Sequence, residues 1–101
     1  MVERYDLATK AWEAMAPLAT ARQAHVVVML DGKLYALGGA NDDDDGYLSS
    51  VERYDPATNA WEAVAPMAVE RVAPAAAVLD GKLYAVGGQN YDDVLGLSSV
   101  E

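Results

Sequence analysis

Cysteine is absent from this chain of 101 residues, and histidine occurs once, as His25. Without cysteine there is no disulfide, no zinc–thiolate site and no thiol nucleophile, and the redox compartment leaves no trace in the sequence. A lone histidine also has no second histidine or cysteine in its own chain with which to bind zinc. Any metal site would therefore depend mainly on oxygen ligands.

Long apolar runs and basic side chains are also scarce. No apolar run approaches the length of a membrane span, and the N-terminal stretch MVERYD is unlike a signal peptide. The chain has 7 lysine and arginine residues against 16 aspartate and glutamate residues, for a net charge of -9. This charge argues against nucleic acids and anionic membranes as partners and favours solubility. No targeting signal assigns a location, so we expect a cytoplasmic one on recombinant expression.

Phenylalanine is absent too, while alanine is abundant and the chain repeats itself. Residues 2–50 align without a gap on residues 51–99, and 31 of the 49 aligned pairs are identical. A fixed period near 50 residues is typical of repeat architectures, in which each unit buries its apolar face against its neighbours. The near-identity of the copies, with neither phenylalanine nor cysteine, favours a designed sequence over a natural one.

Each period carries signals for short antiparallel strands. Asp-Gly stands between two apolar runs at 31–32 and again at 80–81, which predicts two-residue hairpin turns with positive φ. The stretch VERYDPATNAWEAV at 51–64 predicts a second hairpin, in which Asp55 accepts a backbone hydrogen bond and Asn59 adopts the left-handed conformation. With four short strands per period and no helical periodicity, we predict an all-β fold with sheets packed on both faces.

The spacing of a few residue types makes this pattern more specific. In each copy a Gly-Gly doublet ends an apolar strand, a polar loop and VERYD come next, and a tryptophan lies seven residues after the tyrosine, followed by a proline and an arginine. This pattern resembles the kelch repeat over essentially the whole chain, twice. The residues at the motif positions are Gly38, Gly39, Gly87, Gly88, Tyr5, Tyr54, Trp12, Trp61, Arg22 and Arg71.

The resemblance implies that each repeat is one four-stranded blade of a β-propeller, with strand one at the central channel and strand four outermost. It implies an intact blade with strands at 24–30, 33–39, 51–55 and 60–65. Strands three and four of a preceding blade are expected at 2–6 and 11–16, and strands one and two of a following blade at 74–79 and 82–88. The first repeat, 1–50, and the second, 51–101, thus both begin at strand three.

The most conspicuous polar feature is the acidic loop that follows the first doublet. Clustered carboxylates can bind a hard cation such as calcium, but the alternating spacing of a calcium loop is absent. We therefore expect a solvated loop that resists aggregation and binds divalent cations weakly, if at all. His25, where the second copy has Pro74, is expected to be a partly exposed residue at the start of a strand. The weak metal-ligand candidates are Asp42, Asp43, Asp44, Asp45 and His25.

Arg22 and Arg71 precede the innermost strands, and the resemblance implies a structural role in which they pair with loop backbone or acids. The motif tyrosines and tryptophans are expected to pack in the core or between blades, because aromatic rings carry large buried area. Tyr47 and Tyr91 lie in variable loops and are candidates for contact with a partner. Neither a Ser-His-Asp arrangement nor a phosphate-binding loop nor a dinucleotide fingerprint is found, so we expect no enzyme activity and no cofactor.

Two blades alone leave apolar faces and strand edges exposed, and closure into a ring removes both. We therefore expect a non-catalytic scaffold whose copies join head-to-tail. The resemblance implies six or seven blades, and two blades per chain then give a six-bladed homotrimer, with a tetramer second. Because Val100-Glu101 repeats Val2-Glu3, we expect the C-terminal pair to be displaced beside the incoming strand. The alternative is a piece of a natural kelch protein that binds a partner with its loop face.

Overall fold

The computed structural model describes residues 2–41, 46–90 and 96–101, and within them the chain forms eight short strands. These are β1 (Val2–Asp6), β2 (Ala11–Met15), β3 (Val26–Leu30), β4 (Lys33–Leu37), β5 (Val51–Asp55), β6 (Ala60–Val64), β7 (Ala75–Leu79) and β8 (Lys82–Val86). The all-β class predicted from the sequence is confirmed. Among the residues that the structure describes, no helix is long and apolar enough to cross a membrane.

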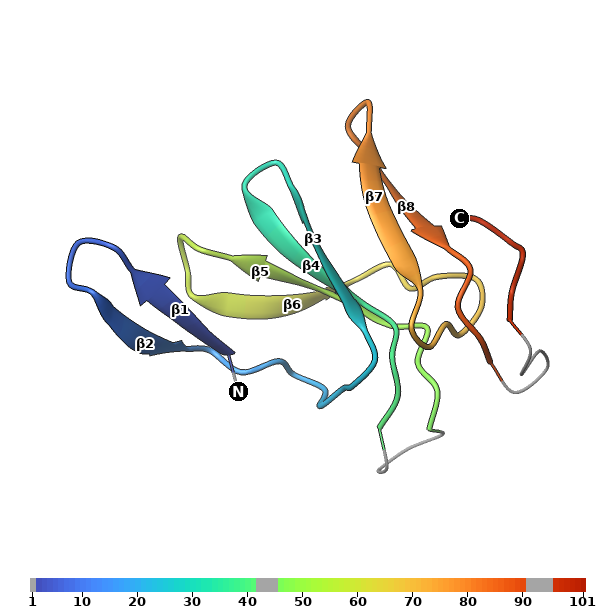
Figure 1. Ribbon diagram of the computed structural model, residues 1–101, viewed down its shortest axis with the longest axis horizontal. Helices are drawn as coiled ribbons and strands as arrows, with labels where there is room; N and C mark the ends of the chain where they lie inside the picture. The colour runs from blue at the N-terminus through green and yellow to red at the C-terminus, as the bar shows by residue number, and fades with distance from the viewer. Residues whose placement is uncertain (1, 42–45, 91–95) are drawn as a thin grey trace.

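The strands form three antiparallel sheets. β3, β4, β5 and β6 make one four-stranded sheet in chain order, whereas β1 pairs with β2 and β7 with β8 in two-stranded sheets. Figure 1 shows β1–β2 at one end of the molecule, the four-stranded sheet in the middle and β7–β8 at the other end. We call the four-stranded sheet the central blade, and the β1–β2 and β7–β8 sheets the N-terminal and C-terminal half-blades.

The inner hairpins turn at the Asp-Gly pairs, as predicted. Asp31 and Gly32 have φ values of 52° and 75°, and Asp80 and Gly81 have values of 52° and 73°. Two successive positive φ values define the tight turn whose twist matches that of antiparallel strands. The registers of β3 on β4 and of β7 on β8 follow from this turn.

The outer hairpins, β1–β2 and β5–β6, have matching turns built on different residues. Ala57 N–H donates to Asp55 Oδ1 at 2.9 Å, as predicted, and Asn59 has a φ of 51°. In the first copy Asp6 accepts the equivalent bond, but Lys10 takes the left-handed place of Asn59, with a φ of 56°. The left-handed region is costly for a side chain that cannot hydrogen-bond locally, so the β1–β2 turn is the more strained of the two.

Several strands are shorter than the resemblance implied. β4 ends at Leu37 and β8 at Val86, so each glycine doublet follows its strand instead of ending it. The doublet glycines have φ values between 65° and 94°, which do not continue a pleated ladder. β3 starts at Val26 and not at residue 24, because Ala24 has a φ of 53°. The other ends differ from expectation by no more than one residue.

The hydrophobic core lies between the central blade and the C-terminal half-blade. Leu37, Val51 and Ala85 are buried at its centre. The partly buried side chains packed against them are Val26, Val28, Tyr35, Val64, Met67 and Leu83. β3 and β7 lie side by side (Figure 1), and Ala73 N–H donates to Ala24 O at 2.7 Å just before the two strands start. Apolar burial thus occurs between blades, as expected of stacked repeat units.

Candidate assembly interface

A buried arginine ties together separate parts of the central blade. Arg22 Nη1 donates to the carbonyl oxygens of Gly38 at 2.8 Å and Ser50 at 3.0 Å. Its Nη2 donates to Ser50 Oγ at 3.0 Å and to Glu52 Oε2 at 2.9 Å. The Arg22 side chain is fully buried, and that of Glu52 is 4% exposed. We call this group of four residues the Arg22 clamp; it joins the residues after β4 to the start of β5.

Glu52 also orders the linker that leads into the central blade. Ala19 N–H donates to Glu52 Oε1 at 2.7 Å, and Thr20 N–H donates to Oε2 at 3.1 Å. A buried carboxylate with a guanidinium and two amide donors has its charge well compensated. Removal of either charged partner leaves the other as an unpaired buried charge, so the clamp stabilises linker and blade as one unit.

The second copy builds the same arrangement around Arg71. Its guanidinium donates to Gly87 O at 2.8 Å, Ser99 O at 3.0 Å, Ser99 Oγ at 3.1 Å and Glu101 Oε2 at 3.0 Å. We call these four residues the Arg71 clamp. The Arg71 side chain is fully buried, but that of Glu101 is 28% exposed. The two clamps are thus chemically alike and differ in how well the glutamate is covered.

The Glu101 carboxyl is stabilised in its charged form. Partial burial by itself raises the pKa of this carboxyl, but hydrogen bonds from Ala68 N–H and from Arg71 outweigh burial and hold the pKa below its ordinary value. The Ala68 bond is 2.6 Å long, and Val69 N–H adds a longer one at 3.4 Å. At neutral pH the Arg71 clamp therefore holds a carboxylate.

The first glycine doublet lets the next linker approach the end of β4. A Cβ on Gly38 would lie 2.4 Å from Arg71 O, and one on Gly39 would lie 2.5 Å from Gln23 O. Either contact would force backbone atoms apart. Gly39 N–H donates to Arg71 O at 2.8 Å, and Arg71 N–H donates to Leu48 O at 3.2 Å. The doublet thus couples the central blade to the linker that carries Arg71.

The motif aromatics differ in burial between the two copies. Tyr54 and Trp61 pack with ring centroids 5.2 Å apart, and Tyr54 is only 5% exposed. Trp61 Nε1 also donates to Ala16 O at 2.9 Å. Tyr5 and Trp12 pack on each other at 5.4 Å, but they are 44% and 66% exposed. This differs from the expected packing role, because no neighbouring blade covers the first pair within the described structure.

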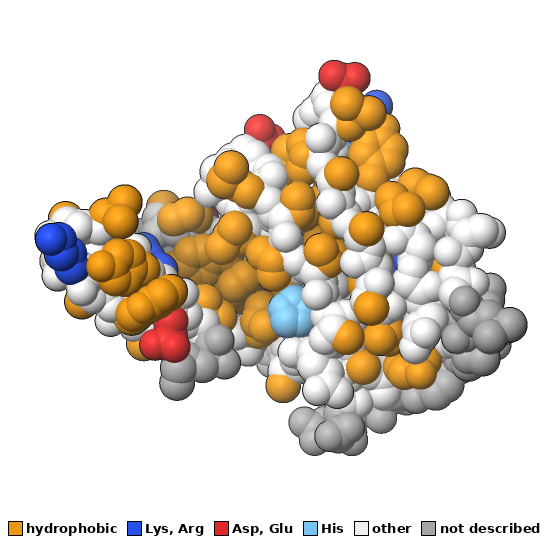
Figure 2. Space-filling model, viewed as in Figure 1, with side chains coloured by type: hydrophobic (Ala, Val, Ile, Leu, Met, Phe, Trp, Pro, Cys, Tyr) orange, Lys and Arg blue, Asp and Glu red, His pale blue; other side chains and the backbone are white. Residues whose placement is uncertain are grey.

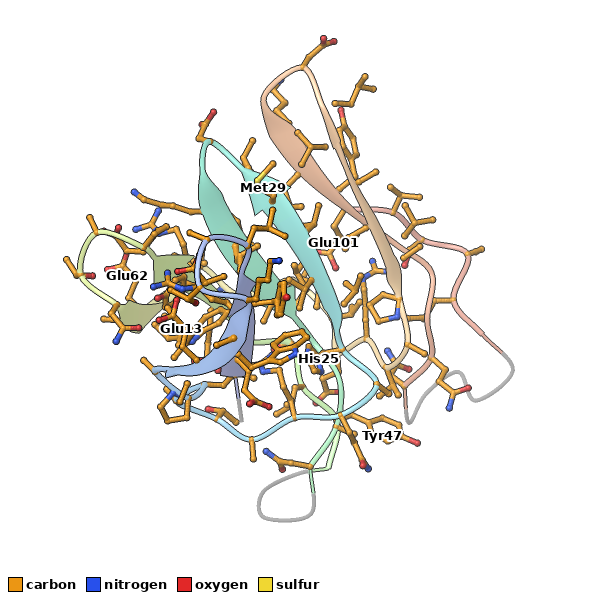
Figure 3. All side chains as sticks on the ribbon, turned by 60° about the vertical axis from the view of Figure 1, so that its left-hand side comes forward. Glu13, His25, Met29, Tyr47, Glu62 and Glu101 are labelled. Carbon is orange, nitrogen blue, oxygen red and sulfur yellow. The ribbon has the colours of Figure 1, made fainter. Side chains whose placement is uncertain are left out.

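His25 lies at the edge of a groove between the N-terminal half-blade and the central blade (Figures 2 and 3). The groove has a volume of about 310 Å³, and its lining includes Val2, Glu3 and Trp61. His25 Nδ1 is buried and has no hydrogen-bond partner among residues 2–41, 46–90 and 96–101. Burial, and then the nearby Arg22 charge, lower the pKa of His25 below its ordinary value. His25 is therefore a neutral, partly buried ring at neutral pH.

Four of the five candidate metal ligands lie outside the residues that the structure describes. Asp42, Asp43, Asp44 and Asp45 lie outside the described residues, as does Tyr91. Among residues 2–41, 46–90 and 96–101, no group of three or more His, Asp or Glu side chains is placed to hold a metal ion. Tyr47, the other loop tyrosine, forms an isolated bridge with Ala40 and is only partly exposed.

Sequence reasoning identified the arginines and the doublets but missed the glutamates that complete the clamps. The resemblance implied that Arg22 and Arg71 pair with loop backbone or acids, and in the structure these acids are Glu52 and Glu101, each 30 residues further along the chain. The available signal was a glutamate that recurs in the sequence with the same period as the arginine. Two further ion pairs among the described residues, Arg4–Glu13 and Arg53–Glu62, lie on the outer hairpins with their side chains at least 30% exposed; Figure 3 labels the two glutamates.

Comparison with known proteins finds one family whose model matches most of the sequence. A family model described as "Kelch motif" matches residues 21–68 and 70–101. "Kelch-like protein 33" of Homo sapiens is 52% identical over 40 residues, which make up 40% of this chain and 8% of that protein. "Kelch-like protein 5" of Homo sapiens is 46% identical over 50 residues, 50% of this chain and 6% of that protein.

A solved structure has a similar arrangement of strands. The structure titled "Structure of YjhT" superimposes with a TM-score of 0.71 and 28% sequence identity, over 77% of this chain and 24% of that chain. This chain therefore spans a small part of each of these three relatives.

Proposed function

Because the chain belongs to the kelch repeat family and consists of kelch β-propeller blades, we propose that it is a non-catalytic scaffold that assembles with copies of itself. The C-terminal half-blade of one copy and the N-terminal half-blade of the next would form one composite blade. One observation carries the proposal. β4 pairs with β5 in the central blade, whereas β1, which has the same sequence as β5, pairs only with β2 within the described residues.

The repeat specifies how the half-blades would pair. In the central blade, β4 residues Leu34, Tyr35, Ala36 and Leu37 lie opposite Tyr54, Arg53, Glu52 and Val51 of β5. The equivalent residues of β8 are Leu83, Tyr84, Ala85 and Val86. The equivalent residues of β1 are Tyr5, Arg4, Glu3 and Val2. We expect β8 of one copy and β1 of the next to pair in this order, as an antiparallel ladder.

The contact between a blade and its following linker supports the same arrangement. Gly39 N–H donates to Arg71 O just after β4. The equivalent of Arg71 at the N-terminal half-blade is Arg22, and the equivalent of Gly39 is Gly88. In the assembly the partner's Gly88 N–H would therefore donate to Arg22 O. Each copy thus offers both members of an interaction that the central blade already makes internally.

Apolar surface on both half-blades favours association. The exposed large apolar side chains there include Tyr5, Trp12, Val78, Leu79 and Val86. Figure 2 shows apolar side chains over these half-blades and in the hollow between the N-terminal half-blade and the central blade. Apolar patches and open strand edges of this kind promote pairing with another chain. A second copy fits as the partner because it carries the strands that would complete each sheet.

Ring closure restricts the number of blades. Head-to-tail contacts either close into a ring or continue as a fibre. Each copy contributes the strands of two blades, so a closed ring has an even number of blades. Six blades in a homotrimer agree with the six or seven blades that the kelch resemblance implies, and eight blades in a tetramer are the second candidate. The near-identical copies support a designed sequence.

Light scattering of the purified chain tests this proposal. We expect one species of about three times 10.7 kDa. A species of four times that mass would favour the tetramer. A monodisperse monomer at micromolar concentration would contradict self-assembly.

A further inference from the structure

The Arg71 clamp is occupied in the single chain by a glutamate of that chain. Ala85 N–H donates to Glu101 O at 2.8 Å, and Glu101 N–H donates to Ala85 O at 2.8 Å. Val100 forms a bridge with Val86. Val100 and Glu101 therefore extend the sheet beside β8, and from this position the Glu101 carboxylate accepts a hydrogen bond from Arg71.

Val100 and Glu101 occupy the place that a partner's strand would take in the composite blade. Val51 and Glu52 occupy the equivalent place beside β4, and Val2 and Glu3 begin β1 with the same two residue types. Only one Val-Glu pair fits beside β8 in this register, because each strand edge forms a single ladder. Glu3 is exposed in the single chain and so is available to a partner.

On the basis of the assembly proposed above, we propose that the Arg71 clamp is the recognition site for Glu3 of a second copy, and that Val100 and Glu101 compete with it. When β1 of the second copy pairs with β8, its Glu3 replaces Glu101 at Arg71, and the Val100–Glu101 pair leaves the sheet edge. One carboxylate replaces another. The buried Arg71 is therefore paired before and after the exchange.

The complete clamp in the central blade shows why the partner's glutamate is the better ligand. Glu3 arrives on a five-residue strand already paired with β2, whereas Glu101 extends the sheet for two residues only. The Glu52 carboxylate is almost fully buried, and that of Glu101 is not. A charge-assisted hydrogen bond is stronger where water is excluded. Docking also covers Tyr5, whose equivalent Tyr54 is buried.

The internal glutamate has the advantage of proximity. Because Glu101 is part of the same chain, its effective concentration at Arg71 is high and does not depend on protein concentration. It therefore opposes association at every step of ring formation. We call the protein concentration at which half of the chains are assembled the half-assembly concentration. This competition sets it, and loss of the Glu3 charge or of the Glu101 charge should shift it in opposite directions.

Two variants separate the competitor from the ligand. Deletion of Val100 and Glu101 removes the competitor, and Glu3→Gln neutralises the ligand while keeping its shape. We expect the deletion to lower the half-assembly concentration, and E3Q to raise it, each by at least about tenfold, because a hydrogen bond to a charged group is worth that much. Sedimentation velocity over a range of protein concentrations measures both shifts. E62Q, on the exposed face of β6, is the matched control and should leave the concentration unchanged.

A third variant guards against misfolding of the shortened chain. Glu101→Gln in the full chain weakens the competitor without removing any backbone, so it should also lower the half-assembly concentration. Deletion and E101Q variants that assemble no better than the parent, or an E3Q variant that assembles as well as the parent, would overturn the proposal. A parent chain that remains monomeric throughout would instead overturn the assembly itself, so the two failures are distinguishable.

Discussion

The N-terminal half-blade and the β5–β6 hairpin have nearly the same sequence and different surroundings. Both contain VERYD followed by AWEA, and both form antiparallel hairpins in the same register. Tyr54 is nevertheless buried and Tyr5 exposed. Tyr54 lies opposite Leu34 of β4. Its neighbours Asn59 and Trp61 hydrogen-bond to Ala16 of the incoming linker. No described segment pairs with the other edge of β1 in this way. Local sequence therefore determines the hairpin, and the neighbouring blade determines whether its aromatic residues become part of a core.

Substitution of the equivalent glutamates, Glu52 and Glu3, should give the largest difference between the two hairpins. Glu52→Ala leaves Arg22 as an unpaired buried charge, and we expect a loss of about 3–5 kcal/mol in the free energy of unfolding. Glu3→Ala changes the equivalent residue of β1, which is exposed, so the unassembled chain should lose almost nothing. Urea unfolding at low protein concentration measures both. Equal losses would show that Glu3 is already buried in the single chain.

The tryptophans test whether the N-terminal half-blade gains a cover on assembly. Trp61 donates to Ala16 O, and by the repeat Trp12 would donate to the partner's Ala65 O. In the assembled protein we expect Trp12→Ala and Trp61→Ala each to lower the free energy of unfolding by roughly 2–4 kcal/mol, near the lower end of the range for a buried tryptophan. In the dilute, unassembled chain W12A should cost much less than W61A. Measurement of the free energy of unfolding at two protein concentrations compares the assembled and unassembled states. A small W12A effect at both concentrations would show that no second copy packs on Trp12.

The turns of the two hairpins provide a smaller test. Lys10 has the left-handed conformation that Asn59 has in the second copy. Lys10→Asn should stabilise the protein by about 0.5–1 kcal/mol. Asn59 Oδ1 also accepts from Tyr54 OH at 2.7 Å and from Ala16 N–H at 3.2 Å, so part of the gain should appear only in the assembly. Thermal unfolding measures it, with Asn59→Lys as the reciprocal variant; a K10N variant no more stable than the parent would contradict the strain argument.

The smallest expected effect is a pH dependence at His25. Its pKa is lowered in the folded chain, first by burial and then by Arg22, and the unfolded chain titrates near the ordinary value of about 6.5. The unfolded state thus binds the proton first as pH falls. Stability from the neutral ring is present above about pH 6.5 and is lost as pH falls through the folded pKa.

The variant His25→Pro isolates this effect, because Pro74 occupies the matching place in the second copy. Ala24 and Ala73, which precede these two residues, have φ values of 53° and 54°, so the backbone there accepts proline. We expect urea midpoints at pH 7.5 and 5.5 to differ less in H25P than in the parent chain. An unchanged difference would assign the pH dependence to other groups.

The hairpins were predictable from the sequence because their chemistry is local. Asp31 and Gly32 adopt the positive φ values expected of their turn, and Asp55 and Asn59 have their predicted roles. The sequence identified the glycine doublet as a motif but not why glycine is needed there. A Cβ on Gly38 would clash with Arg71 O, which lies far along the chain.

The clamps and the exposure of the aromatics could not be predicted in the same way. Arg22 and Glu52 lie 30 residues apart and meet through the packing of the linker on the residues between β4 and β5, of which the sequence shows only the shared period. The exposure of Tyr5 depends on a neighbour that its local sequence does not specify. The Arg22 clamp is a contact between distant segments of one blade, and the exposure of Tyr5 is a property of contacts between blades.

Cross-linking tests most directly the central claim that β1 of one copy completes the sheet of β8 in another. The pairing of Tyr35 with Arg53 predicts that Tyr84 lies opposite the partner's Arg4. Opposite residues of antiparallel strands have Cα atoms about 4.5–5.5 Å apart, within reach of a disulfide. The parent chain has no cysteine. Within one chain, β1 and β8 lie at opposite ends of a molecule 46 Å long (Figure 1), so an internal bond cannot form.

The double variant Arg4→Cys with Tyr84→Cys is oxidised at a concentration where the protein assembles, and its mass is measured without reductant. We predict a covalent ring of about three times 10.7 kDa. The control combines Arg4→Cys with Ala85→Cys, which places the two thiols on opposite faces of the sheet, and should not cross-link. Monomers alone in the first variant, or equal cross-linking in both, would contradict the composite blade.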